Sequence, residues 1–419
     1  MKLTTTKTLL ALSFAALTPI TLAAPYDVVD LGGLGGNSSV AYDLNTAGQA
    51  VGFASGPLDE NGERTFIAHA VQFDESGNID LGTLTDGTIS EAIGINDAMV
   101  AVGYSNEIST VEDDNGNEQV VTQNYAVIFE GSSIAKLPSL ERLTNARAFD
   151  INNNNLVILS GSYDVDPDDE ILAVERAFVF NRNDNSYTMI EPFDAGASRR
   201  SYLTSISDNN QVVGFTDVIV DNTTSVKGFV ANTNDLSNLT ELPSIDNRAL
   251  YPMGLNLAGE VVGSIFIPGT GDQREAFYID SGNSQTEPTL LGFIREDYND
   301  SRANDINDNG QIVGRALVST PTLGEFGAFI YEGEQMKDLN TLIACDSGWK
   351  LTEAVSINNS GQILGFGAKD GEVRAFRLDP TGEPVEDCGN SDEPNSGGGS
   401  VPALLLAILA AVGLRRRFS

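Results

Sequence analysis

The stretch DINDNGQIVG at residues 305–314 returns almost letter for letter as SINNSGQILG at 356–365. Five earlier stretches follow the same pattern, and successive copies end 49 to 56 residues apart. Each copy alternates apolar and polar residues, passes through a turn rich in Asn, Asp and Gly, and then alternates again. Pairs such as Asn309-Gly310 tolerate the positive φ angles of a tight turn, so each copy predicts a β-hairpin. The seven copies occupy residues 43–52, 94–103, 150–159, 205–214, 254–263, 305–314 and 356–365.

Further apolar runs follow each hairpin and complete a repeating unit. The two strands of the hairpin are the first two runs of each unit, and a third apolar run follows them. A weaker fourth run comes after the third, as at 78–84, 239–244 and 336–342. Four antiparallel strands in units of about 50 residues, without helical periodicity, are typical of β-propellers. We therefore predict an all-β fold, a seven-bladed β-propeller of four-stranded antiparallel blades, over residues 26–388. The third runs lie at 69–73, 125–129, 176–180, 227–231, 275–279, 327–331 and 374–378.

The two ends of the array predict how the ring closes. The seventh unit has no fourth run, whereas an unpartnered apolar run precedes the first hairpin at 26–34. We expect this N-terminal strand to complete the last blade, which would remove the exposed sheet edges. Cys345 and Cys388 are the only two cysteines and flank that blade, so a disulfide between them is predicted in an exported protein.

The repeat also carries a family resemblance. A third strand of the form [HRE]AF beside an INxxGQIVG hairpin resembles the HAF repeats of uncharacterised extracellular bacterial proteins, most clearly at 348–365. The likeness covers roughly residues 26–380 and implies an extracellular location without an established activity. It departs in the third copy, where Leu159 and Asn155 replace glycines. We expect that blade to be irregular.

The first 23 residues have the three parts of a secretory signal peptide. Lys2 and Lys7 give a basic start, an apolar run continues to about Leu22, and small residues offer a cleavage site near Ala23. Export is therefore expected.

The C-terminus predicts a second processing signal. A Gly/Ser-rich linker at 389–400 precedes an apolar segment within 401–419 that is short for a permanent membrane anchor. The layout resembles the GlyGly-CTERM sorting signal of Gram-negative bacteria. The resemblance implies cleavage near the glycines by a rhomboid-type protease (rhombosortase) and delivery to the cell surface or medium. A tethered precursor would touch the inner membrane transiently; the alternative is a simple membrane tail. The residues concerned are Gly397, Gly398, Gly399, Arg415, Arg416 and Arg417.

Charge excludes one class of partner. The 59 acidic residues against 24 basic ones would repel phosphate backbones, so nucleic-acid binding is not expected. No cofactor or metal site is predicted. Acidic stretches at 111–118 and 164–170 could supply calcium ligands, but neither has the spacing of a twelve-residue calcium loop.

No catalytic residue can be assigned from the sequence. His69, the single histidine, occupies a repeat position that holds quite different residues in the other units, which indicates a structural role. We expect the long loops at 106–124, 164–175 and 217–227 to lie on one face, opposite the hairpin turns. The residue just before each first strand should surround a channel mouth on that face: Val40, Glu91, Arg147, Leu203, Tyr251, Arg302 and Glu353.

These observations favour a non-catalytic binding module for an extracellular protein or polysaccharide. Two alternatives stay open: a glycan-acting hydrolase that uses channel carboxylates, and a calcium-dependent adhesion module. The predicted binding residues are Trp349, Tyr251, Arg147, Arg302, Glu91 and Glu353.

Overall fold

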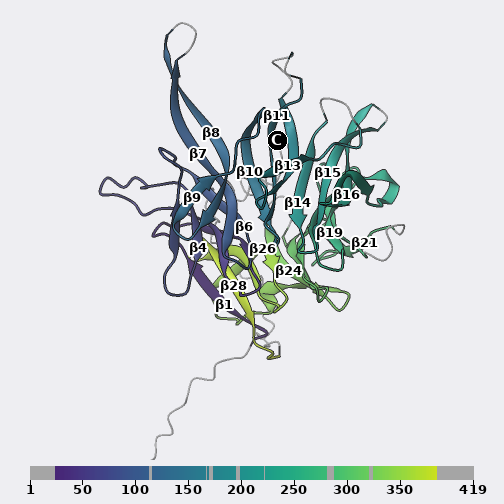
Figure 1. Ribbon diagram of the computed structural model, residues 1–419. Coiled ribbons are helices and arrows are strands. Elements are labelled where there is room, and N and C mark those ends of the chain that lie inside the picture. Colours follow the sequence, from purple (N-terminus) through teal and green to yellow (C-terminus); the bar gives the residue numbers. More distant parts are fainter. Residues whose placement is uncertain are drawn as a thin grey trace, which may run out of the picture.

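The computed structural model describes residues 24–112, 116–166, 168, 173–194, 199–220, 222–280, 287–319 and 324–384. Within these residues the chain forms seven four-stranded sheets, in which every neighbouring pair of strands is antiparallel (Figure 1). First strands of successive blades contact one another all the way round, including the last with the first. The predicted seven-bladed β-propeller is therefore confirmed.

The strands follow the repeat in chain order. Blade one contains β2 (Ser39–Leu44), β3 (Ala50–Ala54), β4 (His69–Phe73) and β5 (Ile79–Gly82), and blade two contains β6 (Ser90–Ile95), β7 (Val100–Glu112), β8 (Glu118–Glu130) and β9 (Ser133–Lys136). Blade three contains β10 (Leu143–Ile151), β11 (Leu156–Asp164), β12 (Ala173–Asn181) and β13 (Ser186–Met189), and blade four contains β14 (Ser201–Ile206), β15 (Gln211–Val220), β16 (Thr223–Asn232) and β17 (Asp235–Glu241). Blade five contains β18 (Leu250–Leu255), β19 (Val261–Phe266), β20 (Arg274–Ile279) and β21 (Thr289–Gly292), and blade six contains β22 (Ser301–Ile306), β23 (Ile312–Leu317), β24 (Phe326–Glu332) and β25 (Gln335–Asp338).

Blade seven confirms the predicted closure. It contains β26 (Trp349–Ile357), β27 (Ile363–Lys369) and β28 (Glu372–Pro380), and β1 (Tyr26–Gly32) supplies its fourth strand by pairing with β28. The two strands lie side by side in Figure 1 although they come from opposite ends of the chain. Cys345 near this blade is disulfide-bonded, and Cys388, its predicted partner, lies outside the described residues.

The apolar core is divided among the blade interfaces. Seven clusters of buried side chains occur in the described residues, and each joins two neighbouring blades. The cluster that contains Val40 and Phe366, for example, joins blade one to blade seven. Burial of apolar surface between neighbours is the main stabilising contribution in such a repeat.

Close packing explains the glycine that ends most copies of the repeat. A Cβ on Gly314 would lie 2.0 Å from the carbonyl oxygen of Arg302 and 2.9 Å from the ring of Phe329. Phe329 belongs to the third strand, directly opposite Gly314. The terminal glycine of GQIVG and the phenylalanine of the following AF motif are therefore two halves of one contact.

A buried asparagine in six of the seven hairpin turns explains another repeated letter, and blade four has Ser207 at the same position. Asn307 accepts hydrogen bonds from the backbone N–H groups of Asn309 (3.1 Å) and Gln311 (3.0 Å), which closes its own turn. Its Nδ2 donates to the carbonyl oxygen of Asn358 in the next blade at 3.0 Å. Asn358 makes the same bond to Asn45 at 3.3 Å, so the pattern crosses the closure. We call the end of the ring that carries these turns the turn face, and the opposite end the loop face.

The structure bears on two sequence-based expectations, the long loops and the irregularity of blade three. The residues expected to form long loops at 106–124 and 217–227 are mostly strand, because β7, β8, β15 and β16 continue into projecting hairpins (Figure 1). Their alternating β-branched residues favour a pleated ribbon. In blade three, Asn155 takes φ 64°, close to the 74° of Gly310, and β10 has a second register shift between Thr144 and Arg147.

The described residues contain no helix with the length and apolar character needed to cross a membrane.

Candidate functional site

A β-bulge in every first strand turns one side chain into the central channel. The register of each first hairpin shifts by one residue at the same place, for example between Ala303 and Asp305 in β22. The bulged residue between them, Asn304, lines a cavity of about 120 Å³ in the channel. Bulges of this kind re-aim side chains without breaking the sheet. The seven channel-lining residues, most of them apolar, are Tyr42, Ile93, Phe149, Thr204, Met253, Asn304 and Val355.

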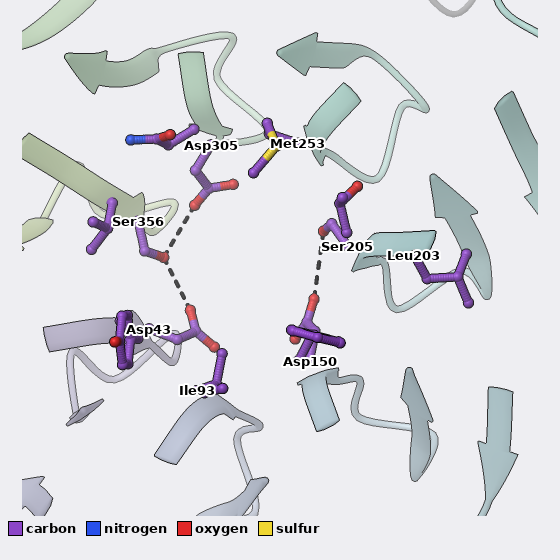
Figure 2. A pocket seen from close by; sticks show the side chains of 13 residues that line it. Asp43, Ile93, Asp150, Leu203, Ser205, Met253, Asp305 and Ser356 are labelled. Atoms are coloured by element: carbon purple, nitrogen blue, oxygen red, sulfur yellow. Dashed lines mark hydrogen bonds between the residues drawn. The ribbon is translucent and has the colours of Figure 1, made fainter. Parts of the chain in front are cut away.

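The next residue of each first strand forms a second layer, toward the turn face. Three blades place an aspartate there, Asp43, Asp150 and Asp305, and two place a serine, Ser205 and Ser356 (Figure 2). The remaining two positions are glycines, and a Cβ on Gly94 or Gly254 would lie within 3 Å of the backbone of Asp150 or Asp305. This layer of the channel therefore carries three carboxyl groups.

Each of these carboxyl groups bonds the backbone of the following blade. Asp43 accepts from Ile95 N–H at 2.9 Å, and Asp305 accepts from Ile357 N–H at 2.9 Å. Asp150 accepts from Ile206 N–H at 3.1 Å. Each also accepts from the N–H of its own following residue, at 2.7 to 2.8 Å. The aspartates hold neighbouring blades together.

Ser356 connects two of the carboxyl groups. Its Oγ lies 3.0 Å from Asp43 Oδ1 and 3.1 Å from Asp305 Oδ2 (Figure 2). A hydroxyl has one proton to donate. Both contacts are hydrogen bonds only when one of the two carboxyl groups is protonated and donates to the serine.

Burial affects the acidity of this layer. The three side chains are half-buried by surface area, because they face the channel, but protein surrounds them deep inside the ring. Desolvation raises the pKa of Asp150 to about 6, with smaller contributions from Asp305 and Asp208. Desolvation and the charge of Asp150 also raise the pKa of Asp43 well above its usual value.

The predicted mouth position lies in the blade interfaces instead of lining the channel. Val40, Glu91 and Glu353 are buried. Glu91 accepts hydrogen bonds from Tyr42 Oη at 3.0 Å and from Tyr104 Oη at 2.8 Å. Leu203 does line the channel cavity (Figure 2), but in blade four the equivalent residue is Tyr202, since Tyr202 pairs with Phe215 as Val40 pairs with Phe53.

Four of the predicted binding residues each have a partner near the loop face: Arg147, Tyr251, Arg302 and Glu353. The Arg147 guanidinium lies 4.6 Å from the centre of the Tyr104 ring, and that of Arg274 lies 3.9 Å from the centre of the Tyr251 ring. Arg302 pairs with Asp300 at 3.3 Å. Glu353 binds Arg315 at 2.9 Å and accepts from Asn304 at 3.0 Å.

Trp349 is half-buried at the start of β26. Its ring packs edge-on against Phe376, with a centroid distance of 5.8 Å, and Lys369 lies 5.2 Å from the ring centre. The structure therefore places Trp349 in the interface of the last two blades, at their loop-face end. The binding role of the predicted residues stays a prediction.

Aromatic and arginine side chains alternate around much of the loop-face half of the interfaces. Tyr202 stacks at a tilt on Phe215 with centroids 4.9 Å apart, and Phe215 meets Tyr251 edge-on at 5.3 Å. Burial raises the pKa of Glu175, and the charges of Arg147 and Arg200 oppose that rise. We call this set the arginine–tyrosine belt: Tyr104, Arg147, Glu175, Arg200, Tyr202, Tyr251, Arg274, Arg302 and Arg315.

Neither the channel layers nor most of the belt were predicted from the sequence. The aspartates are visible as the first letters of three hairpin copies, where the repeat predicts only strand residues. The bulged residues carry no recognisable sequence signal. Arg200 precedes β14, Arg274 begins β20 and Arg315 lies within β23, so no repeat register connects them.

Other sequence predictions fall on structural residues or outside the described ones. His69 stacks on Phe66 with centroids 3.8 Å apart and lies 3.1 Å from Asp80. Among the described residues no group of three or more His, Cys, Asp or Glu side chains could hold a metal ion, and both acidic stretches lie partly outside that range. The processing residues Ala23, Gly397, Gly398, Gly399, Arg415, Arg416 and Arg417 lie wholly outside it.

These features define the class of protein. It is a closed seven-bladed propeller with a carboxylate layer in its channel and an arginine–tyrosine belt near its loop face. The chain belongs to the family described as "Protein of unknown function (DUF3466)", whose model matches residues 80–253 and 250–396. No relative was found among the curated proteins.

Several solved structures resemble the fold at low sequence identity. Porphyromonas gingivalis dipeptidyl peptidase 4 is 8% identical, with a TM-score of 0.44, over 84% of this chain and 53% of that one. Trypanosoma rangeli sialidase is 11% identical, with a TM-score of 0.40, over 85% and 60%. Oligogalacturonate lyase from Vibrio parahaemolyticus is 8% identical, with a TM-score of 0.39, over 87% and 99%. The chain thus spans little more than half the length of the first two, and no activity is transferred from any of them.

Proposed function

We propose that this protein is a non-catalytic binding module for an extracellular polysaccharide, which it binds at the loop face. The arginine–tyrosine belt carries the proposal. Arginine and aromatic side chains are the residues that contribute most to binding surfaces, because they combine large contact area with directed hydrogen bonds. Tyr251 and Trp349 are half-buried at this end of the ring and leave part of their surface accessible.

The channel carboxylates favour binding over hydrolysis. A glycosidase needs one carboxylic acid and one carboxylate that are placed on either side of the scissile bond. Asp43, Asp150 and Asp305 are each held by two backbone N–H groups. Because one of the two bonds of each aspartate joins neighbouring blades, moving a carboxyl group toward a substrate would weaken the ring.

The location of the protein belongs to the same proposal. The signal peptide, the HAF-repeat resemblance and the GlyGly-CTERM-like tail support export, transient tethering at the inner membrane, and processing by a sorting protease before release to the cell surface. Mass spectrometry of the mature protein would test this. The expected ends are a new N-terminus after Ala23 and a new C-terminus near Gly397–Gly399, whereas an intact tail would contradict the sorting model.

Affinity electrophoresis of the purified mature chain would test the binding function. The gels contain either acidic polysaccharides, such as alginate or polygalacturonate, or neutral ones, such as dextran. The protein should migrate more slowly in some of these gels than in others. Its binding should leave the polymer length unchanged. Release of reducing ends would favour the hydrolase alternative, and retardation only with added calcium would favour the adhesion module. Equal mobility in every gel contradicts the proposed function.

A protein partner is the second candidate, and the projecting hairpins favour it. Val120 in β8 is 73% exposed, and Val111, Val121, Ile219 and Val220 are exposed on the same two hairpins. Exposed apolar side chains on a projecting ribbon are typical of interaction surfaces. A protein that binds the wild type but not a V120K variant would support this candidate, provided that polysaccharide retardation is the same for both.

A further inference from the structure

Three arginines from two adjacent blades gather near the loop face. Arg302 in β22 and Arg315 in β23 are directly opposite each other, so their side chains project from the same face of the sheet. Arg274 begins β20 of the preceding blade. Its guanidinium carbon lies over the Tyr251 ring, 3.9 Å from the ring centre. These three side chains are 12% to 17% exposed and therefore reachable from solvent.

The positive charges of the three arginines repel one another. Like charges directly opposite each other on a sheet destabilise it. Burial, followed by the charge of Arg302, lowers the pKa of Arg274 to about 10; Tyr251 and Asp300 oppose this shift, and Arg315 adds a smaller lowering contribution. A bound anion would relieve this repulsion.

The neighbouring carboxylates lie at unequal distances from these arginines. Asp272 reaches Arg274 only at 3.5 Å and is 44% exposed, and Asp300 meets Arg302 at 3.3 Å. Both distances are long for charge-assisted hydrogen bonds, which are usually about 2.7–2.9 Å. Glu353 makes a short bond to Arg315 but also accepts from Asn304.

Two of the three arginines, Arg274 and Arg302, have N–H donors without a hydrogen-bond partner among the described residues. The Nε of Arg274 is buried and has no hydrogen-bond partner among the described residues. Within the same part of the chain, Arg302 donates through Nε alone, to Asp300. A guanidinium has five N–H donors, and a buried donor without a partner indicates an unmade contact to water or ligand.

We infer that Arg274, Arg302 and Arg315 form a binding site for the carboxylate group of a uronic acid residue. This inference rests on the proposed function, since it specifies the acidic sugar of the polysaccharide. Arginine binds a planar carboxylate through two parallel N–H···O bonds. The site contains three arginines and three carboxylates, so a singly charged ligand suits it better than a doubly charged phosphate or sulfate ion.

Small-molecule titration tests the site separately from the polymer. The Tm of the wild-type protein should rise saturably with sodium glucuronate at constant ionic strength, but not with glucose or with sodium sulfate. Arg274→Gln should weaken glucuronate binding by at least about tenfold, the loss expected for hydrogen bonds to a charged group. The control is Arg182→Gln, which removes an arginine that pairs with Glu130 in a different part of the ring. It should bind as the wild type does.

The remaining outcomes are also decisive. Arg302→Lys keeps the charge but loses the planar guanidinium, so it should also weaken glucuronate binding. This variant serves for the test if Arg274→Gln does not fold. An unchanged wild-type Tm, equal binding by Arg274→Gln, or an equal shift with sulfate would overturn the assignment. Glucuronate binding without retention by any polysaccharide would refute the proposed function and leave the site intact. Polysaccharide binding that Arg274→Gln does not change would refute the site and leave the proposed function intact.

Discussion

Asp150 shows how a single residue of the repeat acquires a property that its neighbours in the sequence do not suggest. The pKa of its side chain is raised to about 6 by desolvation in the channel. Because the folded-state pKa is above the unfolded one, the stability contribution is complete below about pH 4 and is lost as the pH rises through about 6. One pKa unit corresponds to about 1.4 kcal/mol, so the loss has an upper limit of about 3 kcal/mol, and channel water will reduce it.

Asp150→Asn should therefore change the pH dependence of stability. The substitution removes the ionisable group and loses one of two backbone hydrogen bonds, a cost that does not depend on pH. The variant should be less destabilised relative to the wild type at pH 8 than at pH 4, as measured by thermal unfolding. Asp184→Asn is the control, since Asp184 lies on an exposed turn where hydrogen bonds from Ser186 lower its pKa. A Tm difference for Asp150→Asn that is constant with pH would rule out the explanation.

The hairpin turn is the element that the repeat specifies most strictly, and its two asparagines have different tasks. The side chain of Asn307 is buried and makes three hydrogen bonds to backbone groups, one of them in the next blade. The side chain of Asn309 is exposed and donates to the carbonyl oxygen of Asn359. The two positions form a matched pair within one turn.

Asn307→Ala should lower the free energy of unfolding by about 2–3 kcal/mol, because it leaves buried backbone groups without partners. Asn309→Ala should cost no more than about 1 kcal/mol, since water replaces an exposed bond. Denaturant unfolding of the two variants gives the comparison directly. Equal losses would show that the buried asparagine does not have the role that its contacts indicate.

The whole molecule depends on a contact between its two chain ends. β1 pairs with β28, and Tyr26 packs in the cluster that joins blades six and seven. Without β1, β28 becomes an exposed edge that can pair with another chain. The cooperativity of a closed ring should decrease at the same time.

Removal of Tyr26–Gly32 from the mature chain should lower Tm by an amount on the order of 10 °C, because apolar surface that β1 covers would return to water. The truncated protein should also form oligomers, as observed by size-exclusion chromatography. A synthetic peptide of the same seven residues should restore the monomer, whereas a scrambled peptide should not. A monomeric truncated protein with the original Tm would mean that closure contributes little.

The blade count, the strand order and the closure could all be predicted from the order of residues. Hairpin turns such as Asn309-Gly310, close-packed glycines such as Gly314 and an apolar first segment act locally or through a regular repeat, so they leave a recognisable pattern. The candidate site leaves no such pattern and arises from packing. A bulge places Asn304 in the channel, and the contact between neighbouring blades brings Arg274 near Arg302 and Arg315. These contacts join residues at unlike repeat positions, and only the assembled ring brings them together.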